Sequence, residues 1–280
     1  MSIEYKILLT GGDGQLAKSY ARMYDNAYIA NKDTFNITNV EHFKSYIKKH
    51  GEPGVIINCA AMTHVDRAER NPELVNEINA FALKNILSHF SGLFIQISTD
   101  YVFDGKIGNY SSTDITKPIN AYGLSKALGE TIVKENSNNW VIIRAGGLFS
   151  NLTQNNFYSW VVNALKKNEV INVVTDQIFN PVSTFDVAQY IKDIQMNNSM
   201  RNKIYHIGSN KNVSKYDFAI RIAKICGLNH EKIKPISTAE LSDINSNYIA
   251  KRPKNSSLSL SNEGDRACDL DCSIEFLKKY

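Results

Sequence analysis

Short apolar runs alternate with segments of helical periodicity along the first half of the chain. The runs are apolar nearly throughout, which is typical of strands buried on both faces of a parallel sheet. They cover residues 5–10, 26–30, 54–60, 93–98 and 140–145. Between them, apolar spacing predicts helices over 14–25, 39–50, 71–90 and 120–130, the third with Pro72 in its first turn. The alternation predicts an α/β fold in which residues 1–150 form a doubly wound parallel sheet (Rossmann).

The pattern loosens in the second half of the chain. It predicts helices over 156–168, 185–195 and 214–227, with strands over 169–175 and 203–209. The tail from Lys232 is rich in serine and asparagine and predicts irregular structure. We therefore expect residues 151–280 to form mainly a smaller C-terminal substrate lobe, with parts of 180–207 returning to the Rossmann domain.

Composition narrows the class of protein. The 280 residues are 43% hydrophobic and 21% charged, with a formal net charge of +4, which suits a globular protein. The basic residues are dispersed, so we expect no nucleic-acid partner. No apolar run could span a membrane and the N-terminus does not read as a signal peptide, so we expect a cytoplasmic protein. The four cysteines lack the spacing of a zinc site and predict free thiols and no metal.

Glycines cluster at the first strand-to-helix turn. Gly11, Gly12 and Gly14 separate the first predicted strand from the first predicted helix, and Ala17 takes the place of a third glycine in the common pattern. Glycine there lets the backbone approach a pyrophosphate at the helix N-terminus. An ordinary tight turn is the alternative, but the position is the one expected for dinucleotide binding.

The end of the second predicted strand bears on which dinucleotide is bound. An acid that holds the adenosine ribose of NAD is common there. This chain has Asn31 and Lys32 instead, followed by Asp33. Lys32 could attract a 2′-phosphate, which favours NADP(H), with NAD(H) as the other option. That Lys32 is only a solvated loop lysine stays open.

A tyrosine and a lysine share one helix face downstream. Tyr122 and Lys126 are four residues apart within a predicted helix. A lysine charge nearby favours the phenolate, so we expect it to lower the pKa of Tyr122 from about 10 and to make it a usable general acid. Ser98 and Thr99 end the preceding strand, at the sheet edge where ligands bind in such folds. The pair therefore predicts chemistry on a carbonyl oxygen.

Six stretches in order carry a family resemblance. They are GGDGQLA, NCAAMTHVDRAE, STDYVFDG with YGLSK, DQIFNPVSTFDVA, YHIGS and RPKNSSL. The chain resembles the extended short-chain dehydrogenase/reductases, and within them the dTDP-4-dehydrorhamnose reductases, over nearly its whole length. The resemblance implies NADPH-dependent reduction of a 4-keto nucleotide-linked deoxysugar in deoxysugar or polysaccharide biosynthesis.

The resemblance also implies roles for individual residues. Thr99 would bind the keto oxygen, Tyr122 would donate the proton, and Lys126 would hold the nicotinamide ribose and tune Tyr122. The cofactor groove would be built from Gly11, Gly14, Gln15, Leu16, Ala60, Ala61 and Thr63, with Asn79 below the active site. The substrate side would include Asp100, Val102, Phe103, Asn180, Arg252, Pro253 and Asn255. We expect Asp66 and Glu69, in contrast, to lie on a solvated helix face.

One segment departs from the family pattern. Gly146 and Gly147 replace a small residue and a tryptophan that the family usually has, and Phe179 stands where a glycine is common. Two glycines remove an apolar surface that would face the sugar. Either Phe179 or a bulkier substrate must fill the space. We expect a differently configured or differently linked 4-keto sugar to be preferred over dTDP-4-dehydrorhamnose, with restoration of the same pocket by Phe179 as the alternative.

Two other functions stay open at the level of sequence. An epimerase or dehydratase with tightly bound NAD would use the same Tyr122 and Lys126, and Asp100 beside Thr99 keeps the dehydratase in view. A non-catalytic NADP-binding subunit, like the regulatory subunit of methionine adenosyltransferase, is the third reading. The partner implied is a nucleotide sugar, and a homodimer is the expected assembly.

Overall fold

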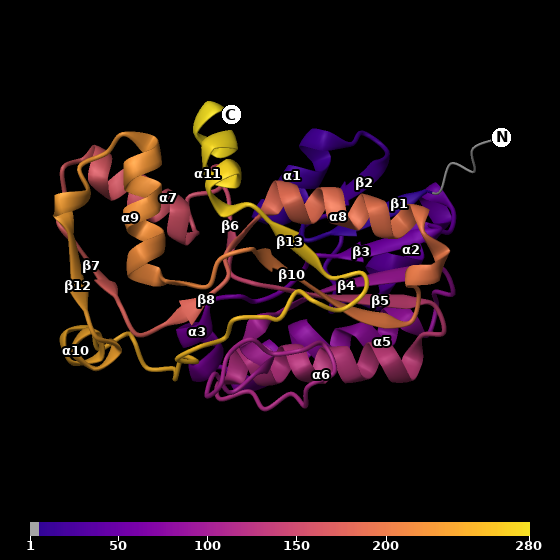
Figure 1. Cartoon of the computed structure of the whole chain (residues 1–280). Helices are drawn as coiled ribbons and strands as arrows, with labels where there is room; N and C mark the ends of the chain where they lie inside the picture. Colours follow the sequence, from indigo (N-terminus) through magenta and orange to yellow (C-terminus); the bar gives the residue numbers. More distant parts are fainter. Residues whose placement is uncertain (1–5) are drawn as a thin grey trace.

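Within the residues that the computed structural model describes, 6–280, seven parallel strands form one sheet (Figure 1). Their order is β13-β10-β5-β4-β3-β1-β2. The strands are β1 (Ile7–Thr10), β2 (Ala27–Ala30), β3 (Val55–Asn58), β4 (Leu93–Thr99), β5 (Trp140–Ala145), β10 (Lys203–Ser209) and β13 (Arg266–Cys268). The predicted α/β fold with a doubly wound parallel sheet is confirmed. Tyr5, which begins the first predicted strand, lies outside the described residues.

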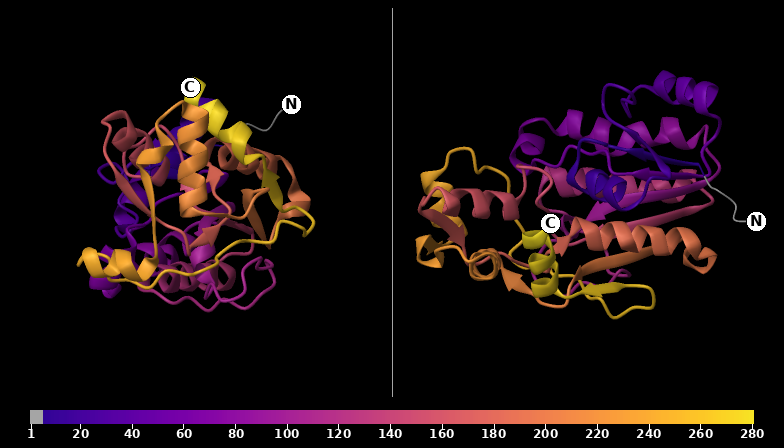
Figure 2. Two further views of the ribbon diagram at one scale, coloured as in Figure 1. Left: turned by 60° about the vertical axis from the view of Figure 1, so that its left-hand side comes forward. Right: turned by 90° about the horizontal axis from the view of Figure 1, so that it is seen from above.

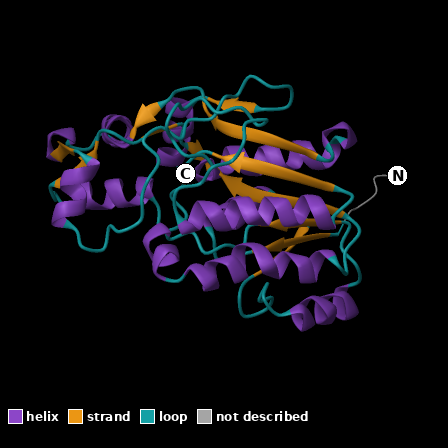
Figure 3. Cartoon of the chain, turned by 90° about the horizontal axis from the view of Figure 1, so that it is seen from below, coloured by secondary structure: helices purple, strands orange, loops and turns teal. Residues whose placement is uncertain are grey.

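Helices cover both faces of this sheet (Figures 1 and 3). On one face lie α1 (Gln15–Met23) and α8 (Thr184–Met196), and on the other α2 (Val40–His50), α5 (Ala82–Leu87) and α6 (Ala121–Asn136). Neighbouring residues of one strand serve opposite faces: Leu8 packs with the α2–α6 layer and Leu9 with the α1–α8 layer. This two-sided burial is why the strands are apolar at every position.

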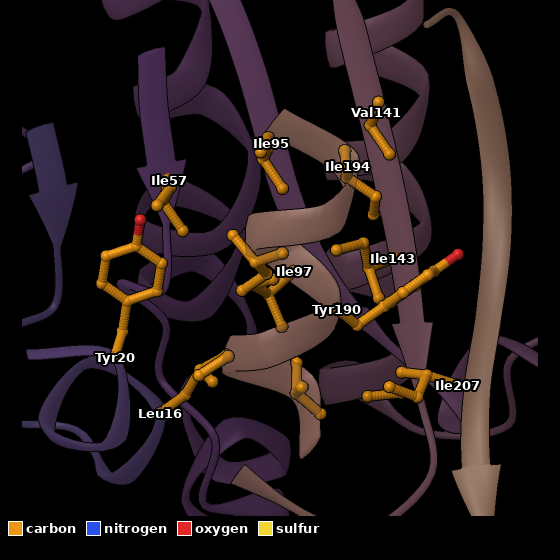
Figure 4. Close-up of a cluster of buried hydrophobic side chains, with 14 of the residues drawn as sticks. Leu16, Tyr20, Ile57, Ile95, Ile97, Val141, Ile143, Tyr190, Ile194 and Ile207 are labelled. Carbon is orange, nitrogen blue, oxygen red and sulfur yellow. The ribbon is translucent and has the colours of Figure 1, made fainter. Parts of the chain in front are cut away.

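Figure 4 shows the core between the sheet and the α1–α8 layer. Side chains of α8, including Tyr190 and Ile194, lie over Ile143 and Val141 of β5. Leu16 and Tyr20 of α1 extend the same cluster. Removing such large apolar side chains from water is the main stabilising contribution of this layer.

The segment expected to be one helix over 71–90 is divided. It consists of α4 (Pro72–Asn76), a π-helical turn (Glu77–Phe81) and α5. The extra residue in the π turn accompanies an inward-facing, buried Asn79. Hydrophobic periodicity does not register a π turn, because the apolar residues on both sides of it still face the core.

The remaining elements gather at one end of the sheet as a smaller lobe (Figures 1 and 2). Its helices are α7 (Phe157–Lys166), α9 (Lys215–Cys226), α10 (Thr238–Ile244) and α11 (Leu270–Lys279). Its short strands are β6 (Leu148–Phe149), β7 (Ile171–Val174), β8 (Ile178–Phe179), β9 (Val182–Ser183), β11 (Val213–Ser214) and β12 (Ile233–Ile236). The tail is more regular than expected, since it supplies α10, α11 and β13. The apolar face of α11 packs against α9 and provides the order that local composition did not indicate.

The two parts of the chain are interleaved. α8 packs on α1, and β10 and β13 extend the main sheet beyond β5. Residues 266–268 of the tail therefore also belong to the main sheet, in addition to the segment within 180–207 that was expected to return to it. No helix within residues 6–280 combines the length and apolar character needed to cross a membrane.

Candidate active site

A cavity of about 770 Å³ lies between the sheet and the smaller lobe. Gly11, Cys59 and Ala145 line it, and they lie at or just beyond the carboxyl ends of β1, β3 and β5. The lobe contributes side chains from α7, β8 and α9 to the opposite wall. This is the edge at which ligands bind in open parallel sheets, and the volume suits small-molecule ligands.

The glycine turn after β1 fits a pyrophosphate. Gly11 has φ +71, and a Cβ there would lie 2.7 Å from the backbone nitrogen of Ala60. Gly14 is the N-cap of α1 and provides no side chain to cap the first N–H groups of the helix, and the first turn has no acidic residue. Uncapped N–H groups beside a close-packed backbone form an anion site. Gly14, Gln15 and Leu16 line the cavity here, as do Ala60, Ala61 and Thr63 across it.

The loop after β2 reaches the cavity through Lys32. Its side chain lines the cavity. Asn31 does not line it, because its amide oxygen accepts hydrogen bonds from the backbone nitrogen and the hydroxyl of Thr34, both at 3.0 Å. Of the two residues expected to contact the adenosine end of a dinucleotide, the structure therefore brings only Lys32 to the cavity.

Thr99, Tyr122 and Lys126 converge on the middle of the cavity. Thr99 is the last residue of β4. Asn120 is the N-cap of α6, and its side chain accepts from the backbone nitrogen of Gly123, so the helix begins just before Tyr122. The Lys126 amine is buried and donates to the carbonyl of Ile97 at 2.6 Å. A hydroxyl, a phenol and an ammonium group thus face one small volume, as required for acid–base chemistry on a carbonyl oxygen.

The prediction that the pKa of Tyr122 is lowered is wrong. Burial raises the pKa of Tyr122 to about 12, against the smaller opposite effect of its hydrogen bond with Thr99. Burial also lowers the pKa of Lys126 to about 8, although Glu130 opposes this. The reason is that both groups are desolvated and the Lys126 amine is hydrogen-bonded to Ile97. Tyr122 is therefore a protonated donor across the physiological range.

A buried ion pair lies behind Lys126. Glu130, one helical turn further along α6, accepts from Arg144 of β5 at 2.8 Å, and both side chains are at most 3% exposed. Ser98 also donates to Glu130, at 2.5 Å. The pair connects the helix that carries Tyr122 and Lys126 to the two strands that end at the cavity.

Asp100 follows Thr99 and lines the cavity from a buried position. It accepts from the hydroxyls of Thr99, at 3.0 Å, and Ser256. Burial raises its pKa to about 6, while these two hydrogen bonds and the charge of Lys215 act in the opposite direction. The Thr99 hydroxyl proton therefore points to Asp100 and must turn from it to reach a ligand oxygen.

Six of the expected site residues lie behind the cavity wall and do not line it. Val102 and Phe103 are fully buried in a core cluster with Tyr110 and Leu258. Asn255 packs on Gly108 and accepts from Ser257. The other three are Asn79, Asn180 and Arg252. Motif position did not distinguish a residue in contact with a ligand from a neighbour that supports it.

Asn79 and Asn180 have clear supporting contacts. The Asn79 side chain pairs with both backbone polar groups of Met62 and donates to Ser125, so it fixes the loop after β3 to α6. The Asn180 side chain pairs in the same manner with the backbone of Leu258. Both amides are buried and hydrogen-bonded, which orients the cavity-lining segments next to them.

Asp66 is not on a solvated face, contrary to expectation. It is buried, and it accepts from both terminal nitrogens of Arg252 and from the backbone nitrogens of Ile249 and Ala250. Burial would raise the pKa of Asp66, but these hydrogen bonds outweigh it and lower the value to about 2. Arg252 also lies over the ring of Tyr248, at 3.9 Å. The ion pair ties the tail to α3 (Val65–Arg70). Glu69 is exposed, as expected, and accepts from the backbone nitrogen of Ala121.

Phe179 fills the space beside the two glycines that depart from the family pattern. A Cβ on Gly147 would lie 2.5 Å from the Phe179 ring, and a Cβ on Gly146 only 1.9 Å from the carbonyl oxygen of Asn180. The loop that carries Phe179 thus approaches too closely for any side chain at either position. Phe179 itself lines the cavity and packs against Phe218. The expectation of a different sugar rested on open space here, and it loses that physical basis.

Several lining residues were not identified from the sequence. One group comes from the lobe: Thr153, Asn155, Phe157, Gln177, Ile178, Lys215, Phe218 and Ser256. Tyr101 also lines the cavity, with its ring edge-on to Tyr122 at 6.1 Å. One feature of the sequence could have indicated Lys215: it is the first residue of a helix that Ser214 caps, just after a short strand. Within residues 6–280, no group of His, Cys, Asp or Glu side chains is arranged to hold a metal ion, and the four cysteines are free.

The chain matches known proteins over nearly its whole length. Residues 5–267 match the family model described as the RmlD substrate binding domain. A dTDP-4-dehydrorhamnose reductase of Aggregatibacter actinomycetemcomitans is 34% identical over 274 residues, covering 91% of this chain and 90% of the relative. A spore coat polysaccharide biosynthesis protein of Bacillus subtilis is 30% identical over 256 residues, covering 89% and 86%. The crystal structure of dTDP-4-dehydrorhamnose reductase from Bacillus anthracis in complex with NADP superposes with a TM-score of 0.89 at 29% identity and covers 98% of each chain.

Proposed function

Because the chain belongs to the RmlD substrate binding domain family, we propose that it reduces the C4 keto group of a nucleotide-linked deoxysugar with NADPH. It is an oxidoreductase that acts on a nucleotide sugar, like the reductases to which it is similar. The observation that carries the proposal is the convergence of Thr99, Tyr122 and Lys126 in one cavity with the glycine turn. Relatives named for polysaccharide or glycan biosynthesis support a role in making such sugars.

The cofactor is NADP(H), and the residues present fit it. Gly11, Gly14 and the N-terminus of α1 would hold the pyrophosphate, and Lys32 would hold the 2′-phosphate. Lys126 would contact the nicotinamide ribose. When bound, NADPH supplies the hydride for the C4 carbon.

The residues of the chain divide the remaining work. The Thr99 hydroxyl turns from Asp100 to the keto oxygen and orients it. The Tyr122 phenol donates its proton to the same oxygen, and its pKa of about 12 ensures that the proton is present. The Lys126 ammonium stabilises the tyrosinate that remains. Thr99 and Lys126 are buried and Tyr122 is half-buried, which strengthens these interactions because little water competes for them.

The rate of reduction should fall at alkaline pH because of Lys126. Its pKa of about 8 is lower than that of Tyr122, so it is the first of the two to lose its proton as the pH rises. We expect kcat/KM to be level below about pH 7, to be halved near pH 8 and to approach a tenfold fall per pH unit above that, since this parameter reports groups of the free enzyme.

The matching variant for the pH dependence is Lys126→Arg. A guanidinium group keeps its charge throughout this range, so the residual activity should show no fall between pH 8 and 10. A wild-type profile that stays level to pH 10 would contradict the role given to the lysine charge.

Lys32→Ala should change cofactor preference. If Lys32 binds the 2′-phosphate, its loss removes a charge-assisted hydrogen bond, worth about 1.5–3 kcal/mol. We expect the apparent KM for NADPH to rise at least tenfold and that for NADH to stay within about twofold. Lys49→Ala, an exposed lysine of α2 outside the cavity, is the control. Equal effects on both cofactors would mean that Lys32 is only a loop lysine.

One incubation separates this function from its two rivals. The protein is mixed with NADPH and 4-keto sugars linked to dTDP, CDP, GDP or UDP, and both sugar product and nicotinamide absorbance are followed. We expect oxidation of one NADPH per sugar, with dTDP-4-dehydrorhamnose reduced most efficiently because Phe179 already closes the pocket. Conversion of sugar without net oxidation would indicate an epimerase or dehydratase. No turnover with any sugar would indicate a binding subunit.

We propose three further properties of the protein, which are its assembly, its location and the division of its binding sites. The chain would act as a homodimer, and it would do so in the cytoplasm. Residues 1–150 with the returning segments would bind the cofactor, and the lobe would bind the nucleotide sugar. Size-exclusion chromatography with light scattering tests the first of these directly.

A further inference from the structure

Four cationic side chains line the cavity within the described part of the chain: Lys32, Arg67, Lys126 and Lys215. A nucleotide sugar carries two ionised phosphate groups, and these require a cation on the substrate side. Lys32 lies after β2, in the cofactor half, and the Lys126 amine donates to the carbonyl of Ile97. Arg252 does not line the cavity and is paired with Asp66. This leaves Lys215 and Arg67 as the candidates.

Lys215 is the only cationic side chain that the lobe, residues 151–280, contributes to the described lining of the cavity. It is the first residue of α9, and its backbone nitrogen donates to the carbonyl of Gln177 at 3.1 Å. Its position is thus fixed by the helix start and by the loop after β7. No carboxylate from the lobe lines the cavity within the described residues, so this end is cationic.

The Lys215 side chain is half-buried, and its amine makes no hydrogen bond or ion pair within residues 6–280. Burial and the charge of Arg252 lower the pKa of Lys215 to about 8, while Asp100 and Asp66 act in the opposite direction. Both carboxylates are engaged elsewhere, Asp66 by Arg252 and Asp100 by the hydroxyls of Thr99 and Ser256. A desolvated cation without a direct partner is costly unless a ligand supplies the anion.

A second unpaired group lies on the same wall. The Gln177 side chain is 3% exposed and donates to Thr238 and Tyr248, but its buried carbonyl oxygen has no partner. Buried polar atoms without partners are rare in native proteins. Gln177 also lines the cavity, and its backbone carbonyl accepts from the backbone nitrogen of Lys215, so the two residues are neighbours on this wall.

We propose that Lys215 binds the diphosphate group of the nucleotide-linked substrate, a contact that rests on the function proposed above. Arg67 is the rival cation, because its exposed guanidinium lines the other wall from α3. Lys215 is favoured because it is half-buried, whereas Arg67 is exposed, and because its backbone is hydrogen-bonded within the lobe. Binding would thus join the lobe to the catalytic side of the cavity through one charge pair.

The test measures ligand binding directly and does not depend on turnover. Calorimetric titrations use NADP⁺-saturated protein with dTDP, UDP, CDP and GDP, and with thymidine, which lacks phosphate. Lys215→Gln should raise the Kd of each diphosphate that the wild type binds about tenfold to hundredfold, by the same factor for every base. The Kd of thymidine and of NADP⁺ should stay within about twofold. Lys224→Gln, an exposed lysine on the same helix, should change nothing.

The outcomes are distinguishable. If the wild type binds none of the four diphosphates, both this proposal and the proposed function are overturned. If it binds one of them and Lys215→Gln binds it equally well, only the role of Lys215 is overturned. The role of Lys215 is also overturned if Arg67→Gln, and not Lys215→Gln, weakens the binding of the diphosphates. It is overturned as well if Lys215→Gln weakens the binding of thymidine as much as that of dTDP, because this would indicate a structural effect.

Discussion

Replacing Tyr122 with phenylalanine is expected to lower kcat for sugar reduction about 10²–10⁴-fold, the usual contribution of a general acid. The ring stays and keeps its edge-on contact with Tyr101, so the cavity wall is preserved. Only the phenolic proton is lost, and its pKa of about 12 means that the wild type carries it at every working pH. Steady-state kinetics with NADPH and dTDP-4-dehydrorhamnose measures the loss.

The control for this variant is the second phenol of the cavity. Tyr101→Phe removes a hydroxyl from the same wall and should leave kcat within about tenfold of the wild type. The Kd of NADP⁺ should be nearly unchanged in Tyr122→Phe. Near-normal turnover of Tyr122→Phe, or a large loss in Tyr101→Phe instead, would remove Tyr122 from the role of proton donor.

Glu130→Gln is expected to reduce the free energy of unfolding by about 3–5 kcal/mol, since breaking a buried ion pair leaves one charge without a partner. Arg144 is 3% exposed, and its Nε and Nη2 atoms both donate to Glu130. The amide can accept only part of this pattern and carries no charge. Urea denaturation followed by tryptophan fluorescence measures the change.

Two comparisons isolate the buried pair. Glu41→Gln breaks the exposed pair with Lys44 and should cost less than about 1 kcal/mol. The double variant Glu130→Leu with Arg144→Met replaces both charges by apolar groups and should be more stable than Glu130→Gln. If Glu130→Gln unfolds within about 1 kcal/mol of the wild type, the ion pair does not stabilise the junction of α6 and β5.

Phe179 shows how the structure changes an interpretation of substrate choice. Gly146 and Gly147 left open whether a protein ring or a larger ligand fills the space. The close approach of the Phe179 ring to Gly147 answers this for the protein itself. The comparison of nucleotide-linked sugars therefore tests a pocket that is already closed on that side.

The strands and helices of the first half of the chain, and the order in which they bring polar residues to the sheet edge, could be predicted from the sequence, apart from the π turn within residues 71–90. Apolar runs predict buried strands because each strand of a two-sided sheet lacks a solvent face, and this pattern is local. The turn at Gly11 and Gly14 and the spacing of Tyr122 and Lys126 are local as well. Residues of this kind could be identified without coordinates, because each is defined by neighbours a few positions away.

Which polar residues face the cavity depends on how distant segments pack in the folded chain. The sequence predicted a solvated Asp66 and a substrate contact for Arg252. Neither prediction could include the ion pair between them, because the two residues lie 186 positions apart. Val102 and Phe103 follow the cavity-lining Thr99 in sequence but turn into the core, whereas Lys215 reaches the cavity from a distant helix. Burial and charge pairing depend on segments that meet only in the folded chain, and no local pattern encodes them. Burial raises the pKa of Tyr122, opposite to the lowering expected from the sequence, because desolvation is a property of the completed fold.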